Sequence, residues 1–496
     1  MASDTAAPVM RPALLPTAAA IGLLAVYFFV RFRDALLVFF ARDDFWAMDN
    51  AAAIHFNRLA DIGQVFRFSH NGFLLYRPLT AVGYFYVLRQ LFGYDASAYH
   101  ALHLAVHGLN GLLVFAIARR LTASTIGGLA AAVVYAAEPG HASAVYWLST
   151  FTMSGTALVV LTMIYLWLRT SSSVRAVGCA TLQVVGLLAS EHAVVAPLLL
   201  VTIALLRSER EPRRRVVAHL AVPSIVVTAY LTAKVYYFSA VRPFVVTDAY
   251  APRLDLVGWL QRLGQYSAAS LNALALLPLG RRALIGLGCA VTFVVVAALW
   301  RVGRGSDRWR LIAIGGSLFV ISLLPVLPLA GHYFSYFIGI AGLGAALAAV
   351  GSCQLVGGVW WRGVAVSIVA LIVLIDVATD GRAVRDNPEV VLVKGTAEWS
   401  ARWVYRVRNV GDAEQGVREV LIPRDGITDD VFALGGAQRF FTADPPRVEV
   451  YSPTQPPTQA PGRVVLVGQP PPIPDAQLPG WEPQWHWLRL WAGMPG

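Results

Sequence analysis

The chain has 496 residues, of which 57% are hydrophobic and only 14% are charged, and its formal net charge is +11. Soluble domains are about 45–50% apolar and about a quarter charged, so this composition excludes an ordinary soluble globular protein. The apolar residues form long runs, which predicts a polytopic membrane protein. Most arginines flank these runs instead of clustering with exposed aromatic residues, so the positive charge does not indicate nucleic-acid binding.

The apolar runs predict eleven membrane-spanning helices, because a hydrocarbon core of about 30 Å needs around 20 apolar residues in a helix. Their ranges are 14–32, 99–118, 124–142, 145–168, 176–190, 193–207, 216–237, 284–300, 311–328, 334–351 and 363–379. Two further apolar stretches, 77–92 and 256–278, are interrupted by polar residues and are predicted to be helices in the membrane interface. The first run lacks a small-residue cleavage site, so we expect an uncleaved span.

The distribution of arginine orients these spans. When both interfacial stretches are placed on the outer side, the short loops of the opposite side contain fourteen basic residues. The short outer loops, near 138–146, 190–193 and 329–333, contain none, and Arg281 and Arg282 are the outer exceptions. The positive-inside rule therefore predicts a cytoplasmic N-terminus and an extracytoplasmic C-terminus. We expect the protein in the plasma (inner) membrane.

Two domains are expected. Residues 1–379 are predicted to form a transmembrane domain whose first external loop is 33–98, and residues 380–496 a soluble extracytoplasmic domain. Periodicity and turn residues predict that the second domain is small and mixed α/β. Its expected elements are helices at 395–411 and 427–441 and strands at Arg418–Pro423, Arg447–Tyr451 and Arg463–Gly468.

Ionisable residues collect at the predicted outer ends of the spans. Such groups are costly near the membrane core and require an explanation. Each residue alone is compatible with a cap that contacts water at the interface, but seven on one Arg-poor face indicate a common polar cavity. These residues are Asp43, Asp44, Glu138, His141, Glu191, His192 and His332.

Two motifs in the first external loop contain side chains that could act as a general base or bind a phosphate. Asp43 and Asp44 form a carboxylate pair at an apolar boundary, where like charge and partial burial raise one pKa and favour a general base. The alternative is a solvated helix N-cap, a position that Asp favours. Arg77 precedes Pro78 at the start of the first interfacial stretch, where a fixed cation can bind a phosphate, although interfacial snorkelling is equally compatible.

No metal or disulfide site is expected. His103 and His107 are four residues apart and could ligate zinc, but the sequence marks no third ligand and contains no HExxH motif. Hydrogen bonds between packed helices are the favoured role for His107 and Asn110. The three cysteines all lie within apolar runs, which provides neither a metal-binding spacing nor a disulfide framework.

In chain order, these motifs resemble the GT-C class of integral-membrane glycosyltransferases, most closely the protein O-mannosyltransferase-like group that includes the transmembrane TPR-containing mannosyltransferases. The resemblance covers about residues 15–350, and no TPR repeats follow. Its elements are Asp43-Asp44, Ser69-His70 with Tyr76 to Thr80, Tyr99-His100 through His107 and Asn110, Pro139 and His141 with Ala144-Val145, Ser190-Glu191, and His332 to Phe337. The sequence departs from the family pattern at Ser143, where the family has Glu, and at Thr150, Ser190 and His332, where it has cations.

The resemblance implies transfer of a hexose, with mannose as one candidate, from a polyprenyl-phosphate carrier to a protein, lipid or glycan acceptor on the outer face. It implies inverting displacement with Asp43 as the favoured base, and Asp44 orienting the acceptor or balancing cations. No cofactor is implied, and a divalent metal is not required. The implied substrate- or phosphate-binding residues are His70, Arg77, Glu138, His141, Glu191, His192, His332 and Tyr333, with Arg281 as a further candidate cation.

Two other functions remain open at this stage. A transporter or flippase for a lipid-linked or anionic substrate is one, although its ionisable residues would be expected near the membrane midplane. A non-catalytic envelope scaffold that binds partners through the C-terminal domain is the other.

Overall fold

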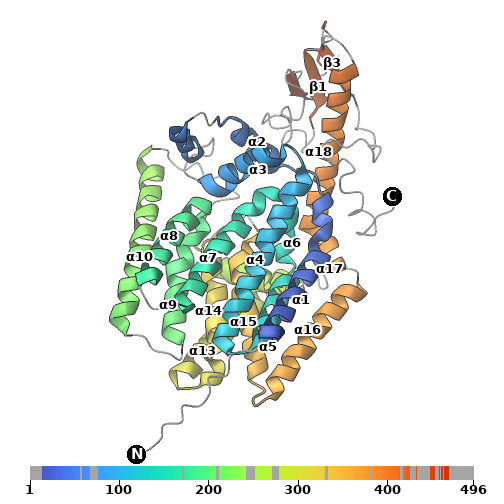
Figure 1. Ribbon diagram of the computed structural model, residues 1–496. Helices are drawn as coiled ribbons and strands as arrows, with labels where there is room; N and C mark the ends of the chain where they lie inside the picture. The colour runs from blue at the N-terminus through green and yellow to red at the C-terminus, as the bar shows by residue number, and fades with distance from the viewer. Residues whose placement is uncertain are drawn as a thin grey trace, which may run out of the picture.

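The computed structural model is a bundle of helices with a small sheet at one end (Figure 1). The N-terminal helix starts at the opposite end of the bundle from the sheet. The structure describes residues 14–55, 58–67, 76–169, 173–207, 212–241, 252–270, 279–329, 333–379, 381–413, 417–424, 432, 447–452, 457–458, 460–461 and 463–467.

A helix is present at each of the eleven positions where a span is predicted. Six of the apolar helices are long and apolar enough to cross a membrane, which makes the chain an integral membrane protein. The total of eleven spans stays a prediction, because the remaining helices are shorter or less apolar. The eleven are α1 (Leu14–Phe32), α4 (Ala96–Thr122), α5 (Thr125–Ala137), α7 (Phe151–Arg169), α8 (Ser173–Ala189), α9 (Ala196–Leu206), α10 (Arg213–Tyr236), α13 (Arg281–Gly303), α14 (Arg310–Leu323), α15 (Ile338–Gln354) and α16 (Trp360–Ala378).

The spans predicted over 124–142 and 145–168 are wrong at their shared boundary. Helix α5 ends at Ala137, and Glu138 takes an extended conformation with ψ of 120°. The cause is Pro139, because a proline disfavours helical backbone at the residue before it. The chain then forms two short helices before α7 starts, namely α6 (Gly140–Tyr146) and η4 (Leu148–Thr150).

Short helices cover the end of the bundle nearest the sheet. The predicted interfacial stretch 77–92 forms the π-helical turn η3 (Pro78–Gly83) followed by α3 (Tyr84–Phe92), and α2 (Asp43–Ala52) lies beside them (Figure 1). The remaining short helices connect longer elements. They are η1 (Arg33–Leu37), η2 (Leu59–Phe66), η5 (Glu191–Val195), η6 (Tyr237–Val241), η7 (Asp307–Trp309), η8 (Ser335–Phe337) and α17 (Arg382–Arg385).

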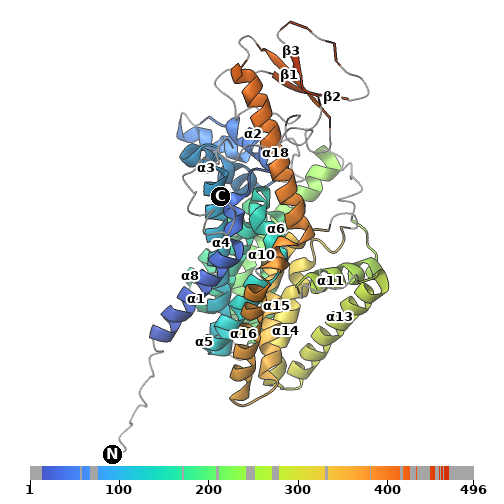
Figure 2. The same ribbon diagram turned by 90° about the vertical axis from the view of Figure 1, so that its right-hand side faces the viewer.

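The second predicted interfacial stretch forms α11 (Leu256–Ser270), which crosses the direction of the neighbouring helices (Figure 2). It packs against α13 at backbone distance, because a Cβ added at Gly264 would overlap the carbonyl group of Leu284. Helices α14 and α15 also approach closely, and a Cβ at Gly344 would lie 2.6 Å from the carbonyl oxygen of Gly315. Small residues thus allow tight packing, as is common between membrane helices.

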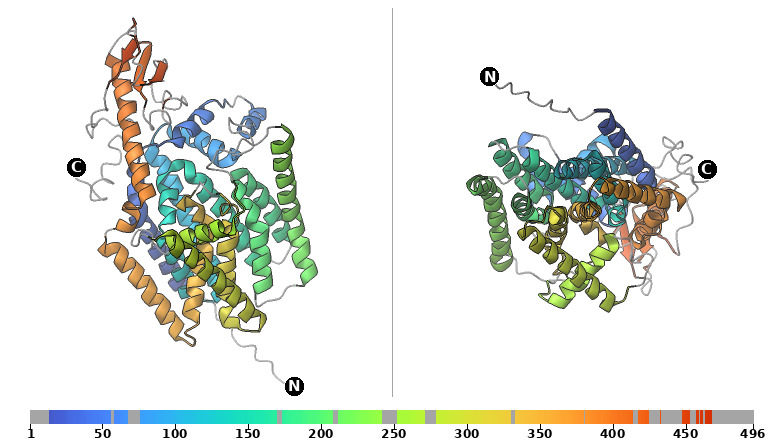
Figure 3. Two further views of the ribbon diagram at one scale, coloured as in Figure 1. Left: turned by 180° about the vertical axis from the view of Figure 1, so that it is seen from behind. Right: turned by 90° about the horizontal axis from the view of Figure 1, so that it is seen from below.

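Helices α10, α13 and α16 form the margin of the bundle, as the view from below shows (Figure 3). Only 11%, 17% and 6% of their most apolar windows is buried within the protein, against 72% for the window that includes α15. Their exposed valine, leucine and isoleucine side chains are suited to contact lipid, whereas α4, α5, α7 and α15 contribute to the buried core.

The C-terminal region consists of α18 (Pro388–Ala413) and three strands, β1 (Glu419–Pro423), β2 (Arg447–Tyr451) and β3 (Arg463–Val465). The sheet is parallel, with β1 between β2 and β3. Helix α18 rises from the bundle to the sheet (Figure 2). It begins earlier than the predicted 395–411 because Asn387 accepts a hydrogen bond from the Glu389 N–H and Pro388 occupies the first helical position. The predicted helix 427–441 lies outside the described residues except for Phe432.

Candidate functional site

The two adjacent aspartates differ in exposure, since one is exposed to solvent and the other is buried. Asp43 and Asp44 open α2, and the preceding residue, Arg42, has φ of 46° and ψ of −115°. A positive φ is costly for a residue with a side chain, and such strain is found preferentially at functional sites. After this turn Asp43 is exposed, whereas Asp44 is only 1% exposed. Asp43 is therefore the carboxylate that an incoming molecule can reach.

Asp44 is held by three hydrogen bonds. Its Oδ2 accepts from the Ala41 N–H at 2.8 Å, and its Oδ1 accepts from the N–H and the hydroxyl of Ser149 at 2.7 and 2.6 Å. Burial raises the pKa of Asp44 to about 7, although the hydrogen bonds from Ser149 and Ala41 oppose this rise. These contacts tie the start of α2 to η4, the short helix that precedes α7.

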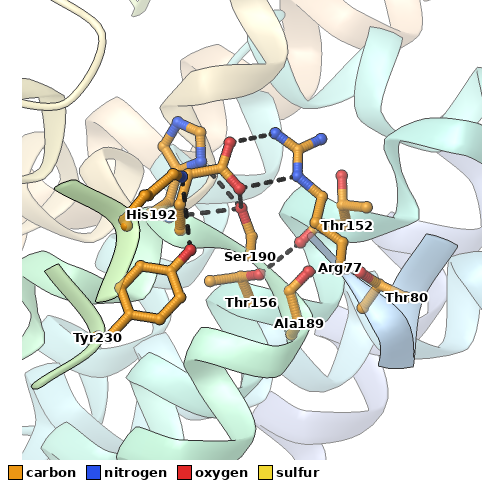
Figure 4. A network of polar contacts seen from close by, with 10 residues as sticks. Arg77, Thr80, Thr152, Thr156, Ala189, Ser190, His192 and Tyr230 are labelled. Carbon is orange, nitrogen blue, oxygen red and sulfur yellow. Dashed lines mark hydrogen bonds and ion pairs between the residues drawn. The ribbon is translucent and has the colours of Figure 1, made fainter. Parts of the chain in front are cut away.

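Arg77 and Glu191 form an ion pair between two segments that are 114 positions apart. The Nε of Arg77 donates to Oε2 of Glu191 at 2.9 Å, and Nη2 donates to Oε1, which gives a bidentate geometry. Figure 4 shows Arg77 facing the turn that contains Ser190 and His192. Burial opposes the ionisation of Glu191, but the charge and hydrogen bonds of Arg77, aided by Lys234, hold its pKa well below its usual range.

The turn at Ser190 is itself well ordered by polar contacts. The Ser190 hydroxyl lies 3.0 Å from Nδ1 of His192, and the Thr80 hydroxyl of η3 donates to the Ala189 carbonyl (Figure 4). The first contact holds the start of η5, and the second anchors η3 to the end of α8. The predicted residues Arg77, Glu191 and His192 therefore belong to one group.

Sequence reasoning missed two members of this group on α10. Tyr230 lies on the side of the Ser190–His192 turn opposite Arg77 (Figure 4), and Nζ of Lys234 is 3.5 Å from the Tyr230 hydroxyl. A signal was present, because Lys234 is one of only two lysines in a chain otherwise supplied with arginine. Lys234 was overlooked because it lies within the span predicted over 216–237.

A second group of predicted residues occupies the turn between α5 and α6. Glu138 and His141 are 3% and 1% exposed, and Oε2 of Glu138 lies 3.2 Å from Nε2 of His141. The His141 ring is 4.1 Å from the ring of Tyr135 and 4.9 Å from that of His107. A Cβ at Gly342 would lie 2.6 Å from Oε2 of Glu138, so α15 leaves room for the carboxylate only because that residue is glycine.

The segment 333–337 lies among these groups. The Phe337 ring stacks on His192 with centroids 5.0 Å apart, and the Tyr336 ring is 6.2 Å from that of Trp147, two positions before Ser149. The Ser335 hydroxyl is 3.0 Å from that of Ser143, two positions after His141. The segment thus contacts His192 beside the Arg77–Glu191 pair, and it lies close in the structure to the Asp44 contact and to the Glu138–His141 turn.

The remaining predicted residues are placed as follows. His70 and His332 lie outside the described residues, whereas Tyr333 is described and its ring is 4.9 Å from that of Tyr266. Arg281 donates to Gln261 of α11 at 3.1 Å.

Among the described residues, no group of three or more His, Cys, Asp or Glu side chains is placed to hold a metal ion. Two of the buried polar residues on α4 contact α7 instead. Asn110 donates to the Ser154 carbonyl at 3.0 Å and His103 lies 2.9 Å from the Ser154 hydroxyl. The predicted interhelical hydrogen bond of Asn110 is confirmed. The prediction for His107 differs from the structure, where its ring packs edge-on against the rings of Phe28 and Phe32 on α1.

The fold and these groups define a helical integral membrane protein with polar side chains gathered near the end that carries the sheet. No protein-family model and no curated protein matches the sequence. Among solved structures the chain is similar to ArnT from Cupriavidus metallidurans bound to undecaprenyl phosphate, with 15% sequence identity, a TM-score of 0.42 and coverage of 85% of each chain.

Proposed function

We propose that this protein is a membrane glycosyltransferase that moves a hexose from a polyprenyl-phosphate carrier to an acceptor hydroxyl. The observation that carries the proposal is the division of the aspartate pair. A strained turn at Arg42 exposes Asp43, while its neighbour Asp44 is buried and held by three hydrogen bonds. Added to the motif resemblance, this geometry favours Asp43 as a general base on a fixed support.

In the proposed reaction Asp43 accepts the proton of the acceptor hydroxyl while the hydroxyl oxygen attacks the anomeric carbon of the sugar. The bond between that carbon and the phosphate oxygen breaks on the opposite face, and the lipid phosphate leaves with the bonding electron pair. A single displacement of this kind inverts the anomeric configuration. A positioned general base typically contributes about 10²–10⁴-fold to the rate.

The leaving phosphate requires fixed positive charge, which we assign to the group around Arg77 and Lys234. Glu191 holds the Arg77 guanidinium in a bidentate contact, and Tyr230 contacts the Lys234 ammonium. An open apolar groove of about 670 Å³ follows the outward face of α10, on the opposite side of that helix from Lys234 and Tyr230. Its lining residues are Ile225, Thr228, Ala229, Thr232, Ala233 and Tyr236.

The test compares cells that express the unaltered chain, Asp43→Asn, or the control Asp49→Asn, which removes another carboxylate of α2. Mass spectrometry of envelope glycans and glycoproteins should show hexose additions that depend on the gene. We expect Asp43→Asn to lose at least about 99% of them, given the usual contribution of a general base, at equal abundance in the membrane, and Asp49→Asn to retain them. Full modification by Asp43→Asn would refute the assignment.

A second assay separates transfer from transport. Purified protein in detergent micelles is supplied with undecaprenyl-phosphate mannose or glucose, tritiated in the sugar, together with an envelope extract from cells that lack the gene. Transfer of the label to the extract requires no second compartment, so it would exclude a transporter as the source of the modification. Failure of both donors to transfer, with binding intact, would contradict the proposed function.

A further inference from the structure

The first turns of α18 are fastened to the membrane bundle by three polar contacts. Asn387 donates from Nδ2 to the Pro139 carbonyl at 3.2 Å, and Lys394 pairs with Asp34 at 2.6 Å. Between them, Glu389 binds Ser335 of η8. This helix precedes the C-terminal sheet and extends from the bundle toward it, so the contacts join the C-terminal region to the polar end of the bundle (Figure 2).

Both carboxylate oxygens of Glu389 accept a hydrogen bond from Ser335. Oε1 accepts from the Ser335 N–H and Oε2 accepts from the Ser335 hydroxyl, both at 2.8 Å. A glutamate in the first turn of a helix commonly serves its own helix, but here Asn387 caps the helix and the Glu389 carboxylate binds another segment. A carboxylate that accepts two hydrogen bonds forms a stronger contact than a neutral acceptor.

The short helix η8, which begins at Ser335, contacts both groups of polar residues in the candidate site. A Cβ added at Gly140 would lie 2.9 Å from the Ser335 carbonyl oxygen, so η8 and α6 meet at backbone distance beside the Glu138–His141 turn. On the other side, Phe337 stacks on His192 of the Arg77–Glu191 group. A shift of Ser335 would therefore move the surroundings of both groups.

We propose that Glu389 is a positioning residue, through which the first helix of the C-terminal domain fixes the segment 333–337 and thereby the geometry of glycosyl transfer. The proposal rests on the proposed function and assigns a role to the C-terminal domain. Glu389 acts through Ser335 and not on the sugar or the phosphate.

Hydrogen exchange of the purified protein, measured by mass spectrometry, tests the positioning without any assay of activity. In Glu389→Ala we expect the Ser335 amide to exchange roughly tenfold faster, because its acceptor is lost. Glu389→Gln should stay close to the unaltered protein, since its carbonyl oxygen accepts from the N–H and its amide can donate to the hydroxyl. Glu398→Ala is the matched control on the same helix, where Glu398 pairs with Arg402 near the surface.

Unchanged exchange at Ser335 in Glu389→Ala would overturn the proposal, and so would equal acceleration in Glu398→Ala. If Glu389→Ala does not accumulate in the membrane, Ser335→Ala removes the hydroxyl half of the contact. Accelerated exchange of the 333–337 segment in that variant supports the proposal, and unchanged exchange refutes it.

The second arm measures transfer with the tritiated donors. We expect kcat to fall about tenfold in Glu389→Ala with a smaller change in the donor KM, and to recover in Glu389→Gln. A loosened segment with an unaltered kcat would refute the role in transfer. If the unaltered protein transfers neither sugar, the proposed function fails, while the exchange data still decide whether Glu389 positions the segment.

Discussion

Asp44 and Ser149, 105 positions apart, share two hydrogen bonds through a single carboxylate oxygen, which accepts from the backbone N–H at 2.7 Å and from the hydroxyl at 2.6 Å. The contact fixes the start of α2 against the segment that leads into α7. Because Asp44 is occupied in this way, the neighbouring Asp43 is the member of the pair directed to solvent. Adjacent residues of the same type therefore have different surroundings, one buried and one exposed.

The stability of the protein should depend on pH through Asp44. Its pKa is about 3.8 when unfolded and about 7 when folded, so the folded state binds more protons between these values. The stabilising contribution is complete below about pH 4 and is lost as the pH rises through about 7, with an upper bound of about 4 kcal/mol. Asp44→Asn should flatten this part of the curve of unfolding midpoint against pH.

A second variant tests independently the direction in which the pKa of Asp44 changes the stability with pH. Ser149→Ala removes a hydrogen bond that favours the charged carboxylate, so it should raise the pKa of Asp44 and move the loss of stability to higher pH. Thermal unfolding in detergent between pH 4 and 8 measures both effects. An unaltered slope in Asp44→Asn would show that other groups cause the pH dependence.

The Arg77–Glu191 pair should be strongly coupled, because the two side chains are only 18% and 21% exposed. Glu191→Gln and Arg77→Gln should each cost about 2 kcal/mol or more, and the double variant less than the sum, with a coupling energy of roughly 1–3 kcal/mol. The exposed Arg310–Asp307 pair provides the control, with an expected coupling below about 0.5 kcal/mol. Equal coupling in both cycles would contradict the buried character of the pair.

Contact between α11 and α13 should not tolerate a methyl group at Gly264, where it would overlap the Leu284 carbonyl. We expect Gly264→Ala to cost about 1–3 kcal/mol because the helices must move apart. Gly286→Ala lies on α13 with open space around its Cβ and should be neutral or slightly stabilising. The unfolding midpoints of the two variants test this prediction. Equal midpoints would show that α11 does not pack against α13 at backbone distance.

The orientation in the membrane can be tested with single cysteines in a background without native cysteine. The positive-inside rule places Leu254 and Glu398 on the outer side and Asp307 on the cytoplasmic side. An impermeant maleimide should label Leu254→Cys and Glu398→Cys in intact cells, and Asp307→Cys only after permeabilisation. The opposite pattern would reverse the topology and place the proposed chemistry on the cytoplasmic face.

The lengths of the apolar runs and the positions of the arginines were enough to predict where the long helices lie along the chain, because membrane spans are determined by local composition. The break at Glu138-Pro139 was missed because the surrounding residues are apolar on both sides. The third strand was predicted over Arg463–Gly468, but β3 ends at Val465; Leu466 and Val467 follow outside the strand, and Gly468 lies outside the described residues.

Pairings between distant segments could not be predicted in the same way. Arg77, Glu191 and His192 were each recognised as unusual, but no local pattern indicates that residues 114 apart form a bidentate pair. Glu389 was missed altogether because it lies in a polar segment where a glutamate is ordinary. Its significance comes only from the packing of α18 against η8, which depends on the tertiary fold.

The scarcity of lysine has a practical consequence. Only Lys234 and Lys394 carry a primary amine on a side chain, and both lie in polar junctions, the first beside Tyr230 and the second against Asp34. An amine-selective acylating reagent therefore has just two side-chain targets in this sequence. Their relative rates of modification, read by mass spectrometry, would report separately on the α10 face and on the docking of α18 without any engineered label.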